Sequence, residues 1–289
     1  MPSAYCPGHI TCIFRPCAGS EETDLLKIGS VGVGIRISLG AEATLEERSD
    51  GKTIITVDGE EGDFPVSRAA MARMLPGRGF ELTVRNGAPT GQGFGMSAAG
   101  AVAAALCAAE LKGETMQAAY VSAHIAELIG GGGLGDVSAI TCPAHVPVRV
   151  RPGLPPDGEV RGTGIKLPKL ALAVLGPKMN TGKILVNPAN YSRIAAAGIS
   201  CLEAFSADES GENLFRQSNA FSSATGIEAP EVSSAVAELN SAGIPAAMCM
   251  LGNSIVAQCG PDELSELLGG VPALGCSSTG ALPHITRRG

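Results

Sequence analysis

Residues 80–112, FELTVRNGAPTGQGFGMSAAGAVAAALCAAELK, hold a predicted strand, a glycine-rich loop and a predicted helix in close succession. Residues 80–85 alternate between apolar and polar side chains, which predicts a half-buried strand. Gly91, Gly93 and Gly95 then form a loop with almost no side-chain bulk, so several backbone N–H groups can converge on one ligand. The alanine-rich run from Ser97 onward predicts a helix that begins directly after the loop.

This succession of loop and helix predicts an anion-binding site. The first N–H groups of a helix have no partner within the helix, and the positive end of the helix dipole faces the same point. Phosphate is the expected ligand. The alternative is that the glycines only make a tight connection between strand and helix, but three glycines at alternate positions directly before a helix favour the phosphate site.

The spacing of the glycines decides between known phosphate sites. The Walker pattern is absent. The segment most similar to it, residues 176–184 (GPKMNTGKI), has one residue too many and has Ile184 where the pattern requires Ser or Thr. An ordinary loop is therefore predicted there. Residues 93–98 (GFGMSA) also fit the dinucleotide-binding pattern G-x-G-x-x-A. The second strand of that fold is missing, and Glu110 and Glu114 do not end a strand.

The loop resembles most the second motif of the GHMP kinases, P-x-x-x-G-[LF]-G-S-S-A-A, in residues 89–99 (PTGQGFGMSAA). The departure is Met96, where the family usually has the first of two serines. The resemblance implies that the loop and the helix N-terminus hold the phosphates of ATP, and that Ser97 reaches magnesium or phosphate oxygens. The nucleotide-binding residues implied are Pro89, Gly91, Gly93, Phe94, Gly95, Met96, Ser97 and Ala98.

A second segment matches the order of the family's catalytic residues. A helix is predicted over residues 115–129 and stops at the glycine run of residues 130–133. GHMP kinases often place a magnesium-binding glutamate late in such a helix and an aspartate after the glycine loop. Glu127 and Asp136, in GLGD, match, which implies that Glu127 and Ser97 bind Mg²⁺ and that Asp136 is the general base. The alternative for Asp136 is a helix N-cap.

The first motif of the family is altered in this chain. Its lysine position is His9 and its glutamate position is Arg15. A guanidinium in place of an acid suggests a substrate with negative charge. The substrate residues implied are His9, Thr11 and Arg15; the alternative is that His9 is a packed loop residue and Arg15 a solvated one.

The rest of the chain gives a coarse order of elements. Residues 29–39 predict a bent strand, and residues 42–48 and 52–57 predict a hairpin. The Pro- and Gly-rich residues 152–158 predict a domain boundary, with an N-terminal domain over residues 1–155 that carries the nucleotide loop and a C-terminal domain over residues 156–289. The second domain is predicted to have helices over 187–205, 209–225, 230–242 and 262–268, and strands over 170–176, 248–251, 254–258 and 273–277.

Composition excludes several classes of protein. The net charge of −7, without a long Lys/Arg cluster, argues against a nucleic-acid partner. No apolar run is long enough for a membrane span, and no signal peptide is predicted. The nine cysteines contain no C-x-x-C pair, so reduced, buried thiols in a cytoplasmic protein are expected.

The third motif of the family is reduced here to residues 245–254, PAAMCMLGNS, with a single glycine. Together with residues 9–11 and GLGD, it resembles the archaeal pantoate kinase branch of the family. This implies an α+β fold of two domains, ribosomal S5 domain 2-like and ferredoxin-like, and an alcohol phosphotransferase that uses ATP and Mg²⁺ to convert (R)-pantoate to 4-phosphopantoate in archaeal coenzyme A biosynthesis.

Three alternatives to this function stay open at this point. One is a GHMP kinase for another small alcohol, of the mevalonate or shikimate type. Another is a catalytically silent nucleotide-binding protein, favoured by Met96, Arg15 and the reduced third motif. The third is a dinucleotide-binding dehydrogenase. The expected partners are ATP and the small-molecule substrate, with a homodimer left open as the assembly.

Overall fold

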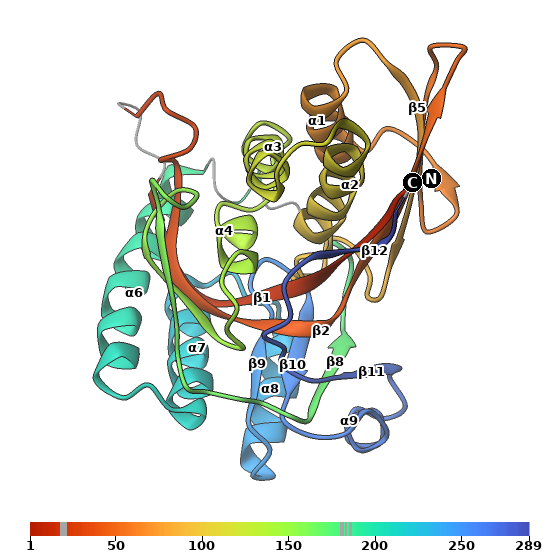
Figure 1. Cartoon of the computed structure of the whole chain (residues 1–289). Helices are drawn as coiled ribbons and strands as arrows, with labels where there is room; N and C mark the ends of the chain where they lie inside the picture. The colour runs from red at the N-terminus through yellow and green to blue at the C-terminus, as the bar shows by residue number, and fades with distance from the viewer. Residues whose placement is uncertain (18–21, 180–181, 183, 185–186, 289) are drawn as a thin grey trace.

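The computed structural model describes residues 1–17, 22–179, 182, 184 and 187–288. Its strands are β1 (Ser3–Cys17), β2 (Gly29–Arg48), β3 (Thr53–Val57), β4 (Glu60–Glu61), β5 (Gly79–Asn86), β6 (Pro147–Arg151), β7 (Glu159–Gly162), β8 (Leu170–Val174), β9 (Ala246–Met248), β10 (Ser254–Ala257), β11 (Ala273–Cys276) and β12 (His284–Arg287). Its helices are α1 (Pro65–Met74), α2 (Met96–Lys112), α3 (Met116–Ile129), α4 (Asp136–Ile140), α6 (Pro188–Ala207), α7 (Gly211–Thr225), α8 (Pro230–Ser241) and α9 (Pro261–Leu267) (Figure 1).

The strands form two sheets. The first has the order β12-β1-β2-β5-β3-β4, with β6 paired to β2 and β7 paired to β6. The second has the order β11-β8-β10-β9. Every pairing among the described strands is antiparallel except that of β3 with β5, so the sheets are not the parallel sheet of a dinucleotide-binding fold. The prediction of an α+β fold is confirmed.

The two long strands β1 and β2 connect the two halves of the protein. They pair antiparallel along almost their whole length, with irregularities between Pro7 and Gly8 and between Thr11 and Ile13. Both strands curve between α2, α3 and α4 on one side and the second sheet on the other (Figure 1). Ile10 and Ile35 belong to the hydrophobic core that the second half of the chain completes. The site residues on β1 are therefore held by packing from both halves.

Helix α2 lies at the centre of the first half. Residues 98–109 of this helix are all buried, and α2 packs on α1, α3, β1 and β2. A helix that is apolar all round is buried on all sides, and alanine side chains let neighbouring backbones approach closely. Gly113 ends the helix in the left-handed conformation, and its N–H donates to the last carbonyls of α2. The helix N-terminus is thereby held in a rigid position.

The predicted hairpin of residues 42–48 and 52–57 is wrong. Strand β5 pairs antiparallel with β2 from Gly79 to Asn86, and β3 lies on the other side of β5, parallel to it. Parallel strands need a crossover connection, and α1 supplies it between β3 and β5. The turn at residues 49–51 is real, but it leads into a strand with a more distant partner.

Two strands of the chain after residue 155 join the first sheet. β7 pairs with β6, and β12 pairs with the start of β1, so the last strand returns to the first half. Sequence patterns predicted neither strand. The domain boundary at residue 155 remains a prediction. β7 and β12 both lie after it in the chain, yet they pair with strands that come before it. The four helices predicted in the second half form, at α6, α7, α8 and α9.

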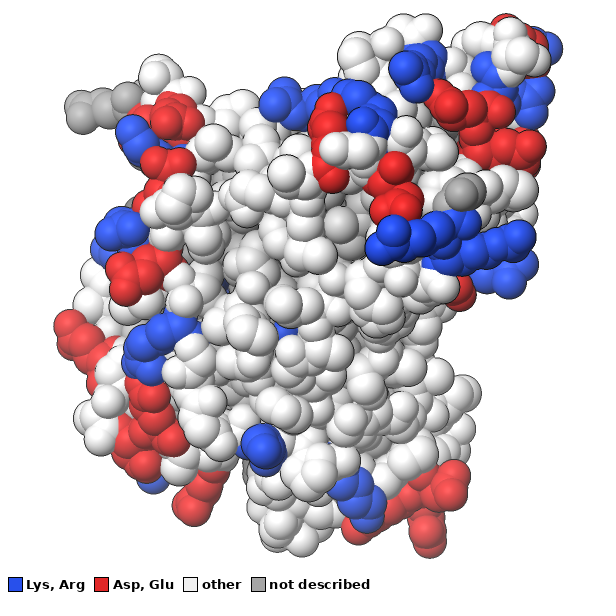
Figure 2. All heavy atoms as spheres, in the orientation of Figure 1, with Lys and Arg blue, Asp and Glu red and all other residues white. Residues whose placement is uncertain are grey.

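Charged side chains lie mainly around the rim of the face shown in Figure 2, where Lys and Arg alternate with Asp and Glu. The middle of this face carries few of them. None of the helices in the described ranges combines the length and the apolar character that crossing a bilayer requires. All nine cysteines are free thiols.

Candidate active site

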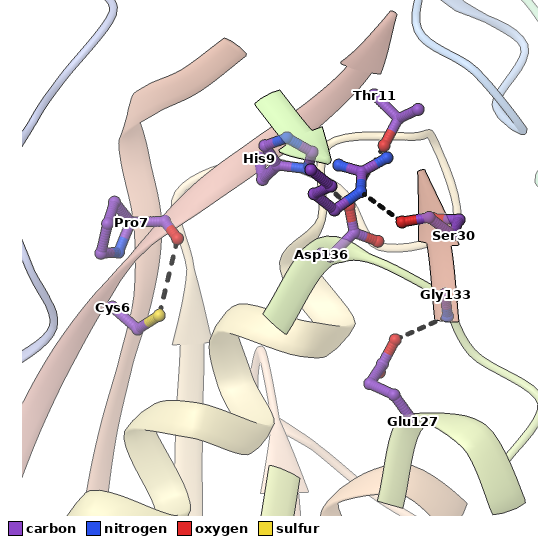
Figure 3. A network of polar contacts seen from close by, with 9 residues as sticks. Cys6, Pro7, His9, Thr11, Ser30, Glu127, Gly133 and Asp136 are labelled. Carbon is purple, nitrogen blue, oxygen red and sulfur yellow. Dashed lines mark hydrogen bonds and ion pairs between the residues drawn. The ribbon is translucent and has the colours of Figure 1, made fainter. Parts of the chain in front are cut away.

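A cavity of about 110 Å³ opens where the glycine loop, the turn before α4 and strand β1 meet. Side chains from four separate segments line it: Thr11 from β1, Glu127 from α3, Asp136 from α4 and Arg149 from β6. Residues 93–98 of the glycine loop form another wall. Figure 3 shows His9, Thr11, Ser30 and Asp136 gathered at one end, with Glu127 at the other.

Residues of the glycine loop and of the start of α2 line this cavity. Gly95 is the N-cap of α2 and gives it no side-chain cap. The first hydrogen bond of the helix runs from Ala99 N to Gly95 O, so the N–H groups of Met96, Ser97 and Ala98 have no partner within the helix. Three unpaired amides at the positive end of a buried helix form an arrangement suited to a phosphate group.

Glycine is required in this loop by its neighbours. Gly93 and Gly95 have φ values of 74° and 69°, which favour glycine. A Cβ atom on Gly93 would lie 2.7 Å from the carbonyl oxygen of Cys249 and 2.8 Å from that of Met250. A Cβ atom on Gly95 would lie 2.5 Å from the carbonyl oxygen of His9. The loop therefore packs closely between His9 on β1 and residues 249–250, which belong to the first and third family motifs.

Met96 lines the cavity, and its side chain is also part of the hydrophobic core. It is 2% exposed, and a Cβ atom on Gly8 would lie only 2.4 Å from its Cε. A serine would leave this space beside Gly8 empty. The departure from the family motif thus has a packing reason, and the backbone N–H of Met96 stays available to a ligand.

Replacing Met96 with serine should lower the free energy of unfolding by about 2 to 5 kcal/mol, because a buried side chain is lost and a cavity remains. Affinity for ATP should be retained, since the N–H is unchanged. Urea unfolding and calorimetric titration measure the two quantities. Met116→Ser is the matched control, because Met116 is 43% exposed, and it should cost about 1 kcal/mol or less. Unchanged stability of Met96→Ser would contradict the packing role.

Glu127 is a buried carboxyl that is held on both oxygens. Ser97 Oγ donates to its Oε1 at 2.6 Å, and the Gly133 N–H donates to its Oε2 at 2.6 Å. The side chain is 3% exposed. Burial raises the pKa of Glu127 to about 7, opposed by the Ser97 hydrogen bond. The structure therefore brings together the two residues that the sequence predicted as magnesium ligands.

Asp136 is held by two neighbours from β1. His9 Nδ1 lies 2.6 Å from Asp136 Oδ1, and Thr11 Oγ1 donates to the same oxygen at 3.5 Å. Burial lowers the pKa of His9, so the imidazole is neutral at pH 7 and donates its Nδ1–H. Burial alone would raise the pKa of Asp136, but the hydrogen bond from His9 and the charge of Arg149 outweigh it and hold that pKa below its ordinary value. Asp136 is thus ionised at pH 7, and it is the first residue of α4 instead of its N-cap.

Arg149 lines the cavity but was not predicted as a site residue. Its guanidinium is 1% exposed, its Nε donates to Ser30 O at 3.3 Å, and its Nη1 has no hydrogen-bond partner in the described part of the chain. It lines the cavity beside Asp136. A Cβ atom on Gly135 would lie 2.5 Å from its Nε, so the glycine of GLGD makes room for it. The available signal was an arginine between Val148 and Val150, because a charged side chain is costly to bury without a partner.

The remaining predicted site residues lie in different places. His9 is fully buried behind Asp136 and does not line the cavity, whereas Thr11 does. Arg15 is partly buried at the end of β1 and is not part of the lining. Pro89 starts the glycine loop and faces a separate open hollow. The structure thus gathers Asp136, Glu127, Ser97 and Thr11, and leaves Arg15 and Pro89 outside.

A second cavity of about 300 Å³ adjoins the glycine loop on the other side of Ser97. Its walls are mostly apolar, with Phe64, Val66 and Val84 among them, and Asn86 and Thr90 add polar groups. Met96 and Ser97 line both cavities. An apolar cavity with a few polar groups, next to the first turn of a helix, has the form of a nucleoside pocket.

Comparisons with known proteins define the class. Residues 66–143, which hold the glycine loop, Glu127 and Asp136, match the family described as GHMP kinases N terminal domain. The fold is also shared with a solved homoserine kinase from Cytophaga hutchinsonii, at a TM-score of 0.70 and 15% identity, over 98% of this chain and 96% of that one. Together with the relatives that follow, these matches show that the chain belongs to the GHMP kinase family.

Pantoate kinases are among the relatives of this chain. The protein named Pantoate kinase from Thermococcus kodakarensis is 30% identical over 277 residues, covering 91% of this chain and 89% of that protein. The Pantoate kinase of Methanospirillum hungatei is 28% identical, over 88% of this chain and 86% of that protein. A solved structure titled "Phosphotransferase related to CoA biosynthesis pathway" has a TM-score of 0.85 at 26% identity, over 99% of this chain and 98% of that one. The predicted family and the prediction of a kinase are confirmed.

Proposed function

We propose that this protein transfers the γ-phosphoryl group of ATP to the primary hydroxyl of (R)-pantoate and so forms 4-phosphopantoate. The observation that carries the substrate assignment is the buried, partly unpaired guanidinium of Arg149 beside Asp136. Pantoate has a carboxylate at one end and a primary hydroxyl at the other. Arg149 fits the carboxylate and Asp136 fits the hydroxyl, in agreement with the names of the relatives.

The nucleotide is proposed to span both cavities. Its base and ribose would occupy the apolar second cavity, and its phosphates would lie on the amides of Met96, Ser97 and Ala98. This orientation directs the γ-phosphate toward Asp136 across the first cavity. Phosphoryl transfer depends mainly on positioning and on electrostatic stabilisation, and a rigid helix N-terminus supplies both.

Mg²⁺ is proposed to bind at Glu127 and Ser97. A carboxylate and a hydroxyl that lie 2.6 Å apart and line one cavity are hard oxygen donors of the kind that Mg²⁺ prefers, so the residues fit the ion. When bound, Mg²⁺ neutralises charge on the β- and γ-phosphates.

A cytoplasmic location and a homodimer remain predictions from the sequence.

The proton of the hydroxyl is proposed to pass to Asp136. Its Oδ1 accepts from His9 and Thr11, which fixes the orientation of the carboxylate and leaves Oδ2 to accept the proton. The side chain is 20% exposed, so it is reachable from the cavity. His9 is thereby proposed to position Asp136 instead of contacting the substrate. A base held in one orientation near the acceptor oxygen assists transfer as the new bond forms.

Glu127 predicts a pH dependence of stability. Its carboxyl titrates near 4.5 in an unfolded chain and near 7 in the folded protein, so the folded protein holds the extra proton between these values. The free energy of unfolding should therefore fall as pH rises from 4.5 to 7, by roughly 3 kcal/mol. Glu127→Gln should lose this part of the slope, as measured by urea unfolding at pH 5 and pH 8.

The control for Glu127→Gln is Glu203→Gln, because Glu203 is exposed on α6. That variant should keep the slope of the unmodified chain. At pH 8, addition of ATP and Mg²⁺ should raise the free energy of unfolding of the unmodified chain more than that of Glu127→Gln. An equal slope in both glutamine variants would show that the Glu127 carboxyl is not stabilised in its protonated form.

A substrate panel tests the proposed function. The purified chain is supplied with ATP, Mg²⁺ and one alcohol at a time, namely (R)-pantoate, mevalonate, homoserine or shikimate, and the phosphorylated product is identified by mass spectrometry. Pantoate should be turned over with the highest kcat/KM. Turnover of another alcohol instead would reassign the substrate within the family. ATP binding without turnover of any alcohol would favour the silent nucleotide-binding protein.

A further inference from the structure

We propose that Lys178 is a phosphate-binding residue of the nucleotide site, supplied by the second half of the chain. This inference rests on the proposed function. Lys178 lies in residues 176–184, whose imperfect Walker spacing predicted an ordinary loop. The structure places the described start of this segment, after β8, directly against the glycine loop.

The contact between the two loops is made by hydrogen bonds on both sides of Lys178. Met179 N donates to Gly91 O at 3.2 Å. Gln92 Nε2 donates to Gly176 O at 3.0 Å. Asn253, which lies in the third motif, donates its Nδ2–H to Pro177 O at 2.8 Å. The backbone around Lys178 is therefore fixed to the glycine loop and is not an independent surface loop.

The side chain of Lys178 lies over the start of the glycine loop. A Cβ atom on Gly91 would lie 3.2 Å from Lys178 Cβ and 3.2 Å from its Cδ, so the stem of the lysine covers this glycine. Its Nζ donates to Thr90 Oγ1 at 3.3 Å. Thr90 lines the second cavity and Gly91 lines the first. Lys178 itself lines the open hollow beside Pro89, and its hydrogen bond to Thr90 holds the ammonium group next to the wall of the second cavity.

The first cavity has little positive charge of its own, so the Lys178 ammonium group would complement the charge of a bound triphosphate. Among the described residues that line it, Arg149 is the single Lys or Arg, and the same lining contains the acidic residues Glu127 and Asp136. A nucleoside triphosphate adds several negative charges. Lys178 forms no ion pair with a described residue, so its charge is available to the ligand. A small shift of its flexible stem would bring Nζ from the Thr90 hydroxyl to a phosphate oxygen.

Calorimetric titration of Lys178→Gln with ATP, ADP and adenosine tests the inference. The Kd for ATP should rise by about tenfold or more, as expected for the loss of a charge-assisted hydrogen bond, and that for ADP should rise as well. The Kd for adenosine should stay within about twofold, because the nucleoside pocket is unchanged. Lys178→Arg should restore most of the ATP affinity.

Lys166→Gln is the matched control, since Lys166 is an exposed lysine of the same half that lines none of the cavities described here. It should bind ATP like the unmodified chain. If the unmodified chain binds ATP and Lys178→Gln binds it equally well, the inference is wrong while the proposed function stands. A parallel loss of adenosine affinity would also overturn it. Failure of the unmodified chain to bind ATP would overturn both.

Discussion

Replacing Asp136 with asparagine should lower kcat for pantoate phosphorylation by about 10² to 10⁴, with a much smaller effect on the KM for ATP. The substitution keeps the size of the side chain and removes the group that accepts the hydroxyl proton. Asparagine can still accept a hydrogen bond from His9, so the local fold should persist. Steady-state kinetics with coupled detection of ADP measure the effect.

The matched control for Asp136→Asn is Asp157→Asn, because Asp157 is exposed in the loop before β7. That variant should keep kcat. A second variant, His9→Gln, tests the positioning role of the imidazole. It should lower kcat less than Asp136→Asn and move the acidic limb of the pH profile of kcat to higher pH, because the hydrogen bond that lowers the pKa of Asp136 is weakened. Full activity of Asp136→Asn would remove the assignment of the base.

Replacing Arg149 with methionine should lower kcat/KM for pantoate by about 10² to 10³, because a buried, hydrogen-bonded charge pair is lost. Methionine fills a similar space without charge. Folding should survive, because replacing a buried charge with an apolar side chain of similar size is often neutral or stabilising. The KM for ATP should change little, since Arg149 is proposed to bind the carboxylate of pantoate and not the nucleotide.

Two comparisons isolate the role of Arg149. Arg151→Met changes an exposed arginine two residues further along β6 and should leave kcat/KM unchanged. The primary amide of pantoate, which has no carboxylate, should be a poor substrate for the unmodified chain and equally poor for Arg149→Met. If Arg149→Met discriminates between acid and amide as strongly as the unmodified chain does, another residue binds the carboxylate. Arg15 would then be the next candidate.

The central part of the fold could be predicted from the sequence because its signals are local. Residues 80–112 hold an alternating strand, glycines at alternate positions and an alanine-rich helix, and each of these features acts through its own neighbours in the chain. The same holds for α3, whose N-cap Thr115 accepts from Ala118 N. Glu127 and Asp136 were found through the resemblance to the family, and the fold brings them to one cavity.

The features that were missed depend on contacts between distant segments. The turn at residues 49–51 gives no sign that β5 will lie between β2 and β3, because the partner of a strand is chosen by the whole sheet. Arg149 looks like a solvated strand residue until Gly32 and Gly135 are seen to leave room for its guanidinium. Met96 looks like a defect in the motif until Gly8 is seen beside it.

A crystal structure of the protein with (R)-pantoate, Mg²⁺ and a non-hydrolysable ATP analogue tests the account most directly. We predict the triphosphate on the amides of Met96, Ser97 and Ala98, and the pantoate carboxylate about 3 Å from the guanidinium of Arg149. The primary hydroxyl should lie between Asp136 and the γ-phosphate. A triphosphate bound away from the glycine loop, or a pantoate hydroxyl on the far side of the cavity from Asp136, would contradict the account.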